Sequence, residues 1–307
     1  MGIRKVAILG LGAVGAYVFW GLTKKSDIDL CVIAEGERKE RLEKDGIVIN
    51  NDRYPIKVKT PQEARGVDLL IVCLKYNGLR PALPDIGQIV GENTVVMSLM
   101  NGVDSEEIIS EVVPESQIVY SMIKVASERV GNTIRFNPEV TIGIFFGEKS
   151  GNNRKRIDAI GELFANTGIN YHATEEIVME IWSKFRLNVA DNQPQAIVGC
   201  GVGAYQDSEH MAFIRRKLQE EVEAVAKAKG VILPPSGPFR CGTVVRPRAR
   251  YSTLQDIDAK RSTEVDMFSG VMVRMGAELG IPTPFNEMTY HLIKSLEEKN
   301  AGLFDYE

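Results

Sequence analysis

A lysine and two asparagines recur at helical spacing within one mostly apolar stretch. In "WSKFRLNVADNQ", Lys184, Asn188 and Asn192 stand at positions i, i+4 and i+8. At roughly 100° per residue, this spacing places them within about 80° of one another on an α-helix. An ammonium group can donate a proton and stabilise a negative oxygen, and amides can orient a carboxylate or hydroxyl without titrating. The stripe predicts a site for a small oxygen-rich molecule; on spacing alone, a solvated helix face is the alternative.

A glycine-rich turn near the N-terminus has the spacing of a phosphate-binding loop. The apolar run Val6 to Leu9 precedes "GLGAVG", and residues of helical character, Ala16 to Thr23, follow it. In this strand–turn–helix context the glycines permit a tight turn, the close approach of a pyrophosphate, and packing of the helix on the strand. The N-terminus of the helix offers unpaired N–H groups to the phosphates. The expected dinucleotide contacts are Gly10, Leu11, Gly12, Ala13, Val14 and Gly15.

An acidic residue stands where the ribose of a dinucleotide is commonly bound. Glu35 follows a second apolar run, Ile28 to Ala34, and lies twenty residues beyond Gly15. A carboxylate there accepts hydrogen bonds from the ribose hydroxyls of NAD and repels the 2'-phosphate of NADP. Three nearby cations could instead hold that phosphate: Arg38, Lys39 and Arg41. Lys39 and Arg41 also fit the solvated first turn of a helix. The choice between NAD and NADP is therefore open.

Two further polar residues follow apolar runs that predict buried parallel strands. Lys75 follows Asp68 to Leu74, and Asn101 follows Thr94 to Leu99. Ligands of open α/β sheets bind beyond the carboxyl ends of the strands, so both residues are candidates for contact with a nucleotide. The alternatives are a surface lysine at a strand end and an ordinary Asn-Gly turn.

The order of the elements predicts two domains. Residues 1–175 alternate strands with helices and, from Ile118 to Phe146, contain mainly strands. Residues 176–307 have helical patterns over Glu176–Ile197, Glu209–Lys229, Ile257–Leu279 and Pro284–Glu298. We expect an α/β fold with an N-terminal Rossmann-type dinucleotide-binding domain and an all-α C-terminal domain, and a small-molecule site in a cleft between them.

Composition argues against several classes of partner. The 307 residues carry a net charge of −4, which provides no basic field for neutralising the phosphates of nucleic acid. Neither the four scattered cysteines nor the three histidines have the spacing of a metal site. Glycines interrupt the N-terminal apolar run, so neither a signal peptide nor a membrane span is expected. The sequence predicts a soluble cytoplasmic protein without nucleic-acid, membrane or metal partners, and a homodimer is compatible with it.

Six segments resemble the ketopantoate reductase (2-dehydropantoate 2-reductase) family, over essentially the whole chain. They are "GLGAVG", "CLKY", "SLMNGVDSEE", "KVA", "WSKFRLNVADN" and "YSTLQDIDAKRSTEVD". The resemblance implies a C-terminal domain like that of 6-phosphogluconate dehydrogenase. It also implies an oxidoreductase of pantothenate and coenzyme A biosynthesis that reduces the 2-keto acid 2-dehydropantoate to pantoate with NADPH.

The same resemblance implies roles for individual residues. Lys184 is expected to be the general acid that protonates the keto oxygen as hydride reaches C2. The residues expected to hold substrate are Asn101, Lys184, Asn188, Asn192 and Ser252. Besides the glycine turn and Glu35, the expected cofactor contacts are Lys75, Asn101, Ala126 and Glu264.

Three features depart from the usual family pattern. A further substrate-side asparagine is expected about ten residues past Asn192, where this chain has Gly201, Val202 and Gly203. Many members have proline directly after the second asparagine, whereas here Gln193 separates Asn192 from Pro194. A basic residue suited to NADP is common where this chain has Glu35, so NAD(H) is the alternative cofactor.

Two other functions remain as alternatives. One is a related NAD(P)-dependent reductase of another 2-keto acid. The other is a non-catalytic NAD(P) sensor, against which the joint presence of Lys184, Ser252 and Glu264 argues, because a pure binding protein has no use for a proton donor beside the nicotinamide.

Overall fold

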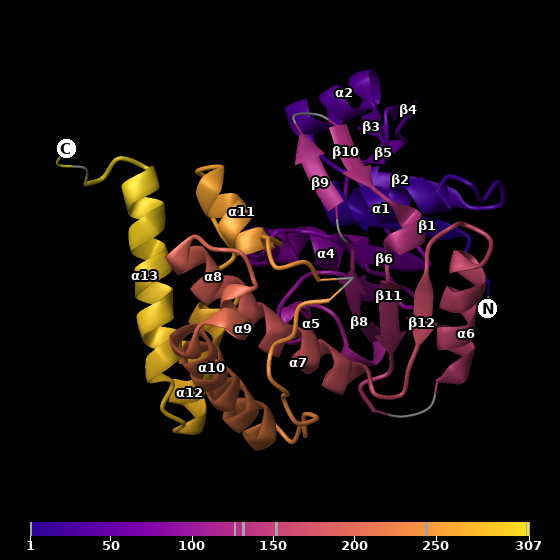
Figure 1. Cartoon of the computed structure of the whole chain (residues 1–307). Helices are drawn as coiled ribbons and strands as arrows, with labels where there is room; N and C mark the ends of the chain where they lie inside the picture. The colour runs from indigo at the N-terminus through magenta and orange to yellow at the C-terminus, as the bar shows by residue number, and fades with distance from the viewer. Residues whose placement is uncertain are drawn as a thin grey trace. The chain divides into compact units, whose positions relative to one another are not determined.

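An eight-stranded sheet organises the N-terminal part of the chain (Figure 1). Its strands lie in the order β12-β11-β8-β7-β6-β1-β2-β5, with the bounds β1 Lys5–Leu9, β2 Asp29–Ile33, β5 Val58–Lys59, β6 Leu69–Val72, β7 Val95–Ser98, β8 Ile118–Lys124, β11 Gly143–Gly147 and β12 Tyr171–Ala173. All neighbours from β5 to β8 are parallel, β8 and β11 are antiparallel, and β11 and β12 are parallel. Strands β1, β6 and β7 are short aliphatic runs that are almost entirely buried, as expected of a parallel sheet covered on both faces.

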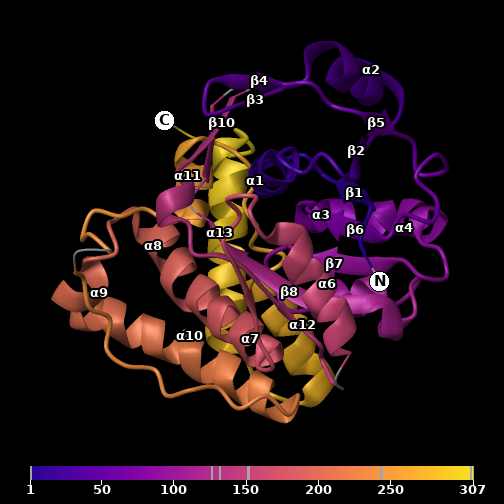
Figure 2. The same cartoon turned by 90° about the vertical axis from the view of Figure 1, so that its right-hand side faces the viewer.

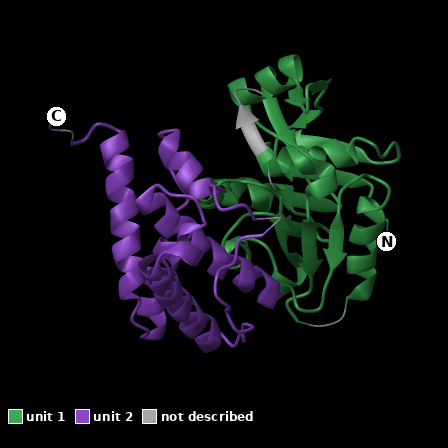
Figure 3. Ribbon diagram, in the orientation of Figure 1, with its two compact units in different colours: residues 1–177 green, residues 178–307 purple. Residues whose placement is uncertain are grey.

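The computed structural model describes residues 2–125, 127–130, 133–150, 153–242, 245–304 and 306, and it forms two compact units, residues 1–177 and 178–307 (Figure 3). The helices of the first unit are α1 Ala13–Leu22, α2 Gly36–Asp45, α3 Tyr76–Leu79, α4 Leu83–Ile89, α5 Ser105–Ile109 and α6 Arg154–Phe164. The large aromatic side chains Tyr17, Phe146 and Phe164 are fully buried in its core.

A second, four-stranded sheet in the first unit has the order β4-β3-β10-β9, with β3 Ile47–Ile49, β4 Asp52–Tyr54, β9 Ser127–Val130 and β10 Thr133–Phe136. Strands β3 and β4 form a hairpin whose two loop residues, Asn50 and Asn51, have φ of 51° and 76°. Positive φ at both loop positions is the geometry of a type I′ turn, which asparagine tolerates. Both views place this sheet beside α2 (Figure 1, Figure 2).

The second unit is helical. It contains α7 Ile177–Leu187, which begins one residue before the unit, α8 Gln193–Val198, α9 Ala204–Asp207, α10 Glu209–Ala228, α11 Ser252–Asp258, α12 Ser269–Leu279 and α13 Pro284–Asn300. The side chain of Ser208 caps α10, Gly280 ends α12 in the left-handed conformation, and a proline begins α13. The predicted fold class, an α/β sheet domain followed by a helical domain, is confirmed. Over the described parts of the chain, no helix is long and apolar enough to span a membrane.

Two of the predicted helices are wrong in detail. The stretch Glu176–Ile197 is interrupted by a π-helical segment, Asn188–Asn192, between α7 and α8. The stretch Ile257–Leu279 is not one helix, because the chain leaves α11 at Asp258 and α12 begins only at Ser269. Lys260 adopts a left-handed φ of 51° in the interval, a conformation that a continuing α-helix does not allow.

Candidate functional site

The parallel strands of the main sheet bring the candidate residues of the first unit to one edge. The glycine turn follows β1, Glu35 follows β2, Lys75 follows β6 and Asn101 follows β7. Because these strands are parallel and in register, their carboxyl ends share that edge. The chain runs from β1 to β2 on one side and returns to β6 on the other, which creates the switch point where α/β sheets bind ligands. The candidate Ala126, beyond β8, lies outside the described residues.

The three glycines of the turn have different structural requirements. Gly10 has a φ of 100°, and a Cβ there would lie 2.5 Å from the carbonyl oxygen of Cys73. A Cβ on Gly15 would lie 2.1 Å from the carbonyl oxygen of Gly10. A Cβ on Gly12, by contrast, would meet no atom of a described residue within 4 Å. The fold therefore requires Gly10 and Gly15, whereas the space at Gly12 is open.

That open space lies at the start of a helix. Gly12 is the N-cap of α1, and the first turn of α1 contains no acidic residue. The N–H groups and the partial positive charge at a helix N-terminus favour an anion. The residues of the turn therefore fit the pyrophosphate of a dinucleotide, with Gly12 leaving the room that it needs.

A pocket of about 250 Å³ adjoins the glycine turn and α2, lined by Leu11, Arg38, Arg41, Leu42, Gly46, Ile47 and Ile134. Neither arginine side chain forms an ion pair or hydrogen bond with another described residue. Lys39, from the same helix, is instead paired with Glu63 at 2.8 Å. Glu35 is the exposed N-cap of α2 and does not line the pocket. The pocket thus combines apolar walls, suited to a base, with two guanidinium groups suited to an anion.

A buried carboxyl group follows Asn101 closely in the sequence. Glu106, on α5, is only 3% exposed and accepts hydrogen bonds from the Ser105 hydroxyl at 2.7 Å and the Ser121 N–H at 3.4 Å. Burial raises the pKa of Glu106 to about 7. Sequence reasoning did not single it out, because "SEE" offers two adjacent acids and only the helix register buries one of them.

We expect Glu106→Gln to remove a pH dependence of stability. The folded pKa of about 7 lies above the ordinary value of 4.5, so the folded state binds the extra proton between these values. The free energy of unfolding should therefore fall by up to about 1.4 kcal/mol per pH unit as the pH rises through that window. At pH 8, above both pKa values, the glutamine variant should be more stable than the wild type by roughly 3 kcal/mol.

Urea denaturation between pH 5 and 8 measures this difference. Glu107→Gln, which alters the exposed neighbouring acid, is the matched control and should keep the wild-type slope. Parallel pH profiles for wild type and Glu106→Gln would contradict the expectation.

The polar stripe of the second unit is partly assembled by a direct contact. Asn188 and Asn192 begin and end the π-helical segment, are 7% and 4% exposed, and the Asn192 Nδ2 donates to the Asn188 Oδ1 at 3.3 Å. Lys184 lies half-buried on α7, one turn earlier. The two amides are therefore in contact, but in a π-helical turn rather than on the regular α-helix that the spacing predicted.

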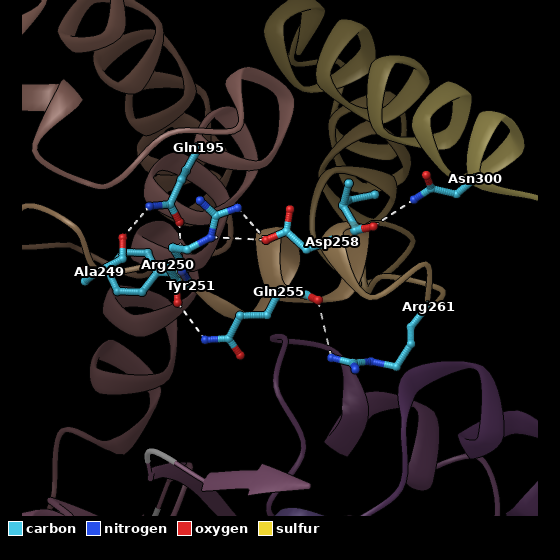
Figure 4. A network of polar contacts seen from close by, with 9 residues as sticks. Gln195, Ala249, Arg250, Tyr251, Gln255, Asp258, Arg261 and Asn300 are labelled. Atoms are coloured by element: carbon cyan, nitrogen blue, oxygen red, sulfur yellow. Dashed lines mark hydrogen bonds and ion pairs between the residues drawn. The ribbon is translucent and has the colours of Figure 1, made fainter. Parts of the chain in front are cut away.

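Ser252 is the exposed first residue of α11, and hydrogen bonds fix the chain that precedes it (Figure 4). The side-chain amide of Gln195, on α8, donates to the carbonyl of Ala249 at 2.7 Å and accepts from the N–H of Tyr251 at 2.8 Å. One buried glutamine thus binds the backbone on both sides of Arg250, so that Ser252 begins α11 at a position fixed relative to α8.

Glu264 lies half-buried in the irregular chain between α11 and α12. The Glu297 carboxylate, on α13, accepts from the N–H of Thr263 at 2.6 Å and from its hydroxyl at 2.7 Å. These bonds fasten the residue before Glu264 to α13. Within the described ranges, no group of three or more His, Cys, Asp or Glu residues is arranged to hold a metal.

Comparison with known proteins matches both parts of the chain to one family. Residues 6–145 match the family model described as ketopantoate reductase PanE/ApbA, and residues 176–297 match that of the ketopantoate reductase PanE/ApbA C terminal. A 2-dehydropantoate 2-reductase from Archaeoglobus fulgidus is 24% identical over 297 residues, which cover 97% of this chain and 99% of that protein.

Solved structures show the same architecture. A PanE/ApbA family ketopantoate reductase from Ralstonia eutropha is similar with a TM-score of 0.78 and 27% identity, covering 97% of this chain and all of that one. The ternary structure of D-mandelate dehydrogenase with NADH and anilino(oxo)acetate gives a TM-score of 0.82 at 20% identity, covering 97% of this chain and all of that one. The second likeness concerns the fold alone.

Proposed function

Since the chain belongs to the ketopantoate reductase PanE/ApbA family, we propose that it reduces 2-dehydropantoate to pantoate with a nicotinamide dinucleotide. This reaction would place it in pantothenate and coenzyme A biosynthesis. The observation that carries the proposal is the buried amide pair Asn188–Asn192, one turn beyond Lys184. Such a set can hold and protonate a keto acid, and it occurs in a chain whose glycine turn fits a dinucleotide.

In this proposal Lys184 supplies the proton. The bound nicotinamide provides the hydride that reduces C2 of the keto acid. The Lys184 Nζ donates a hydrogen bond to the keto oxygen, stabilises the negative charge that develops there, and transfers a proton to it. The product is then the neutral hydroxyl of pantoate.

The two asparagines orient the substrate. The Asn192 Nδ2 is engaged with Asn188, whereas the Asn192 Oδ1 is buried without a hydrogen-bond partner among the described residues. A buried acceptor of this kind costs free energy unless a donor reaches it. A substrate hydroxyl is a suitable donor, and 2-dehydropantoate has one. Ser252 is proposed to contribute a further hydroxyl to the same substrate, and Glu264, with Lys75 and Asn101, to contact the cofactor.

Steady-state turnover on a panel of 2-keto acids tests this assignment. We expect kcat/KM for 2-dehydropantoate to exceed that for pyruvate and for phenylglyoxylate by at least about 100-fold, because a site built to bond a hydroxyl rejects analogues that lack it. A preference for phenylglyoxylate would favour a reductase of another 2-keto acid. Cofactor binding without turnover on any keto acid would favour the sensor.

For the cofactor we propose NADP(H), held by the pocket beside the glycine turn. Arg38 and Arg41 line this pocket without a protein partner among the described residues, and Leu11 joins it to the turn. A 2'-phosphate would supply the anion that the two guanidinium groups lack. Glu35, which would disfavour that phosphate, is exposed and outside the lining.

The double variant Arg38→Ala/Arg41→Ala should weaken the binding of NADPH by about 100-fold while changing that of NADH less than threefold, at roughly tenfold for each charge-assisted contact. Titration with adenosine 2',5'-bisphosphate measures the same loss without catalysis. Lys39→Ala is the matched control, because it removes a cation that pairs with Glu63. Equal losses for NADPH and NADH, or a wild type that prefers NADH, would contradict the NADP(H) proposal.

A further inference from the structure

The π-helical segment between α7 and α8 depends on side chains to bond its backbone. Pro194 has no N–H, so it cannot donate to the preceding turn of the helix. The Gln193 Nε2 reaches back and donates to the carbonyl of Val189 at 3.1 Å. The side chain of Gln193 thus bonds a carbonyl that a backbone N–H would bond in a regular helix.

A tyrosine hydroxyl is inserted at the next step. In an α-helix the N–H of Gln195 would donate directly to the carbonyl of Asp191, four residues earlier. Here the Gln195 N–H donates to the Tyr205 hydroxyl at 3.0 Å, and that hydroxyl donates to the Asp191 carbonyl at 2.6 Å. Insertion of a side chain into the i→i−4 ladder is a recognised cause of helix distortion. Tyr205 therefore holds the two turns apart while satisfying both groups.

Tyr205 is well placed to hold this position rigidly. Its side chain is only 3% exposed, and its ring packs against Phe239 with centroids 5.4 Å apart. Burial raises the pKa of its hydroxyl, so the group stays protonated and can donate and accept at once. The carbonyl that Tyr205 bonds belongs to Asp191. The side chain of Asp191 is also fixed, because its Oδ1 accepts a hydrogen bond from the Nε of Arg215, on α10, at 2.6 Å.

The two backbone groups that Tyr205 bonds lead to two predicted substrate contacts, Asn192 and Ser252. Asn192 is the residue directly after Asp191, and its amide pairs with Asn188 across the π turn. Gln195, whose N–H the tyrosine receives, binds the chain before Ser252 through its side chain (Figure 4). The Tyr205 hydroxyl thus joins the amide pair to the segment that begins α11.

We propose that Tyr205 is a positioning residue for the keto acid: its hydroxyl keeps the π turn open and so sets the orientation of Asn188 and Asn192 relative to Ser252. The proposal rests on the proposed function, in which these three residues hold the substrate. Tyr205 itself need not touch the substrate, because it acts through the backbone at Asp191 and Gln195.

The test is Tyr205→Phe, which keeps the ring and removes the hydroxyl. We expect KM for 2-dehydropantoate to rise about tenfold, the effect of roughly 1.4 kcal/mol, while KM for the cofactor stays within twofold. Protection by pantoate against thermal unfolding should weaken in parallel, which is a readout independent of turnover. Tyr290→Phe is the matched control, because it removes a hydroxyl bonded to Asp266 at 2.9 Å in the same unit; it should leave both keto-acid readouts unchanged.

A second variant covers the case in which Tyr205→Phe does not fold. Pro194→Ala restores an N–H that can donate to the carbonyl of Ala190 in α-helical geometry, and it should also raise the keto-acid KM several-fold. Wild-type keto-acid KM in the folded variants would overturn the proposal. So would equal changes in Tyr290→Phe, since these would indicate a general loss of stability.

Hydrogen exchange separates this proposal from the function on which it rests. The Gln195 amide should exchange faster in Tyr205→Phe whatever the substrate is, and unchanged exchange would overturn the proposed role. If the wild type does not reduce 2-dehydropantoate, the proposed function is wrong. The role of Tyr205 is then tested by the exchange rate of the Gln195 amide and by KM for whichever keto acid the protein reduces.

Discussion

Lys184→Ala is expected to lower kcat by about 10²–10⁴-fold, the usual contribution of a positioned general acid. The keto oxygen would then gain negative charge with no proton donor beside it. The dissociation constant of NADPH should change less than threefold, because the expected contacts to the pyrophosphate and adenosine come from the first unit. Stopped-flow absorbance and fluorescence titration measure the two quantities. Lys217→Ala, which removes a half-buried lysine paired with Glu220 at 2.7 Å on α10, should leave both unchanged.

Lys184→Arg separates the positive charge from the proton. Arginine remains charged but does not give up its proton at neutral pH. The proposal therefore predicts near-normal KM for the keto acid with a kcat still lowered at least about tenfold. A kcat close to wild type in either Lys184 variant would remove this lysine from the chemistry.

Gly12→Val is expected to abolish dinucleotide binding while leaving the fold intact. A Cβ at Gly12 meets no atom of a described residue within 4 Å, and its φ of −86° is accessible to valine. The side chain would occupy the space that the pyrophosphate needs at the start of α1. We expect NADPH affinity to fall by at least about 100-fold, corresponding to roughly 2.7 kcal/mol, with a melting temperature within a few degrees of wild type.

Gly15→Ala, in the same turn, is expected to destabilise the fold, whereas Gly12→Val should leave it intact. A Cβ on Gly15 would lie 2.1 Å from the carbonyl oxygen of Gly10, so the turn itself must shift and the melting temperature should fall. We thus expect the fold to require Gly15 and the dinucleotide to require Gly12. Equal destabilisation by both substitutions would contradict this expectation, as would NADPH binding by Gly12→Val with wild-type affinity. Calorimetry and fluorescence titration distinguish these outcomes.

The sequence was most informative where a local pattern determines the structure. The run from Val6 to Gly15 predicted a strand, a turn and a helix, and the structure has β1, the turn and α1 there. The spacing of Asn188 and Asn192 predicted that they share one helix face, and the structure keeps them as neighbours in the widened turn, with a hydrogen bond between their amides.

The π turn itself could not be predicted from that stretch. Its opening depends on Tyr205, ten residues beyond Gln195, which reaches the helix only through the tertiary fold. The predicted helix around Glu264 was wrong for a similar reason. Glu297, on α13, captures the N–H of Thr263 and holds that chain in an irregular form.

The roles of the basic residues of α2 could not be predicted without the fold. From the sequence, Lys39 and Arg41 both fitted a solvated position on the helix. The structure pairs Lys39 with Glu63 and places Arg41, with Arg38, in the wall of a pocket. The β3–β4 hairpin, which contributes Ile47 to that wall, was not foreseen because each of its strands has only three residues.

Isotope transfer tests the central claim most directly. NADPH deuterated at both C4 positions should yield pantoate that is one mass unit heavier, with the deuterium on C2, when wild-type protein is incubated with 2-dehydropantoate. Lys184→Ala, at the same protein concentration, should form the same labelled product far more slowly. Unlabelled pantoate, or no consumption of 2-dehydropantoate by the wild type, would contradict the account.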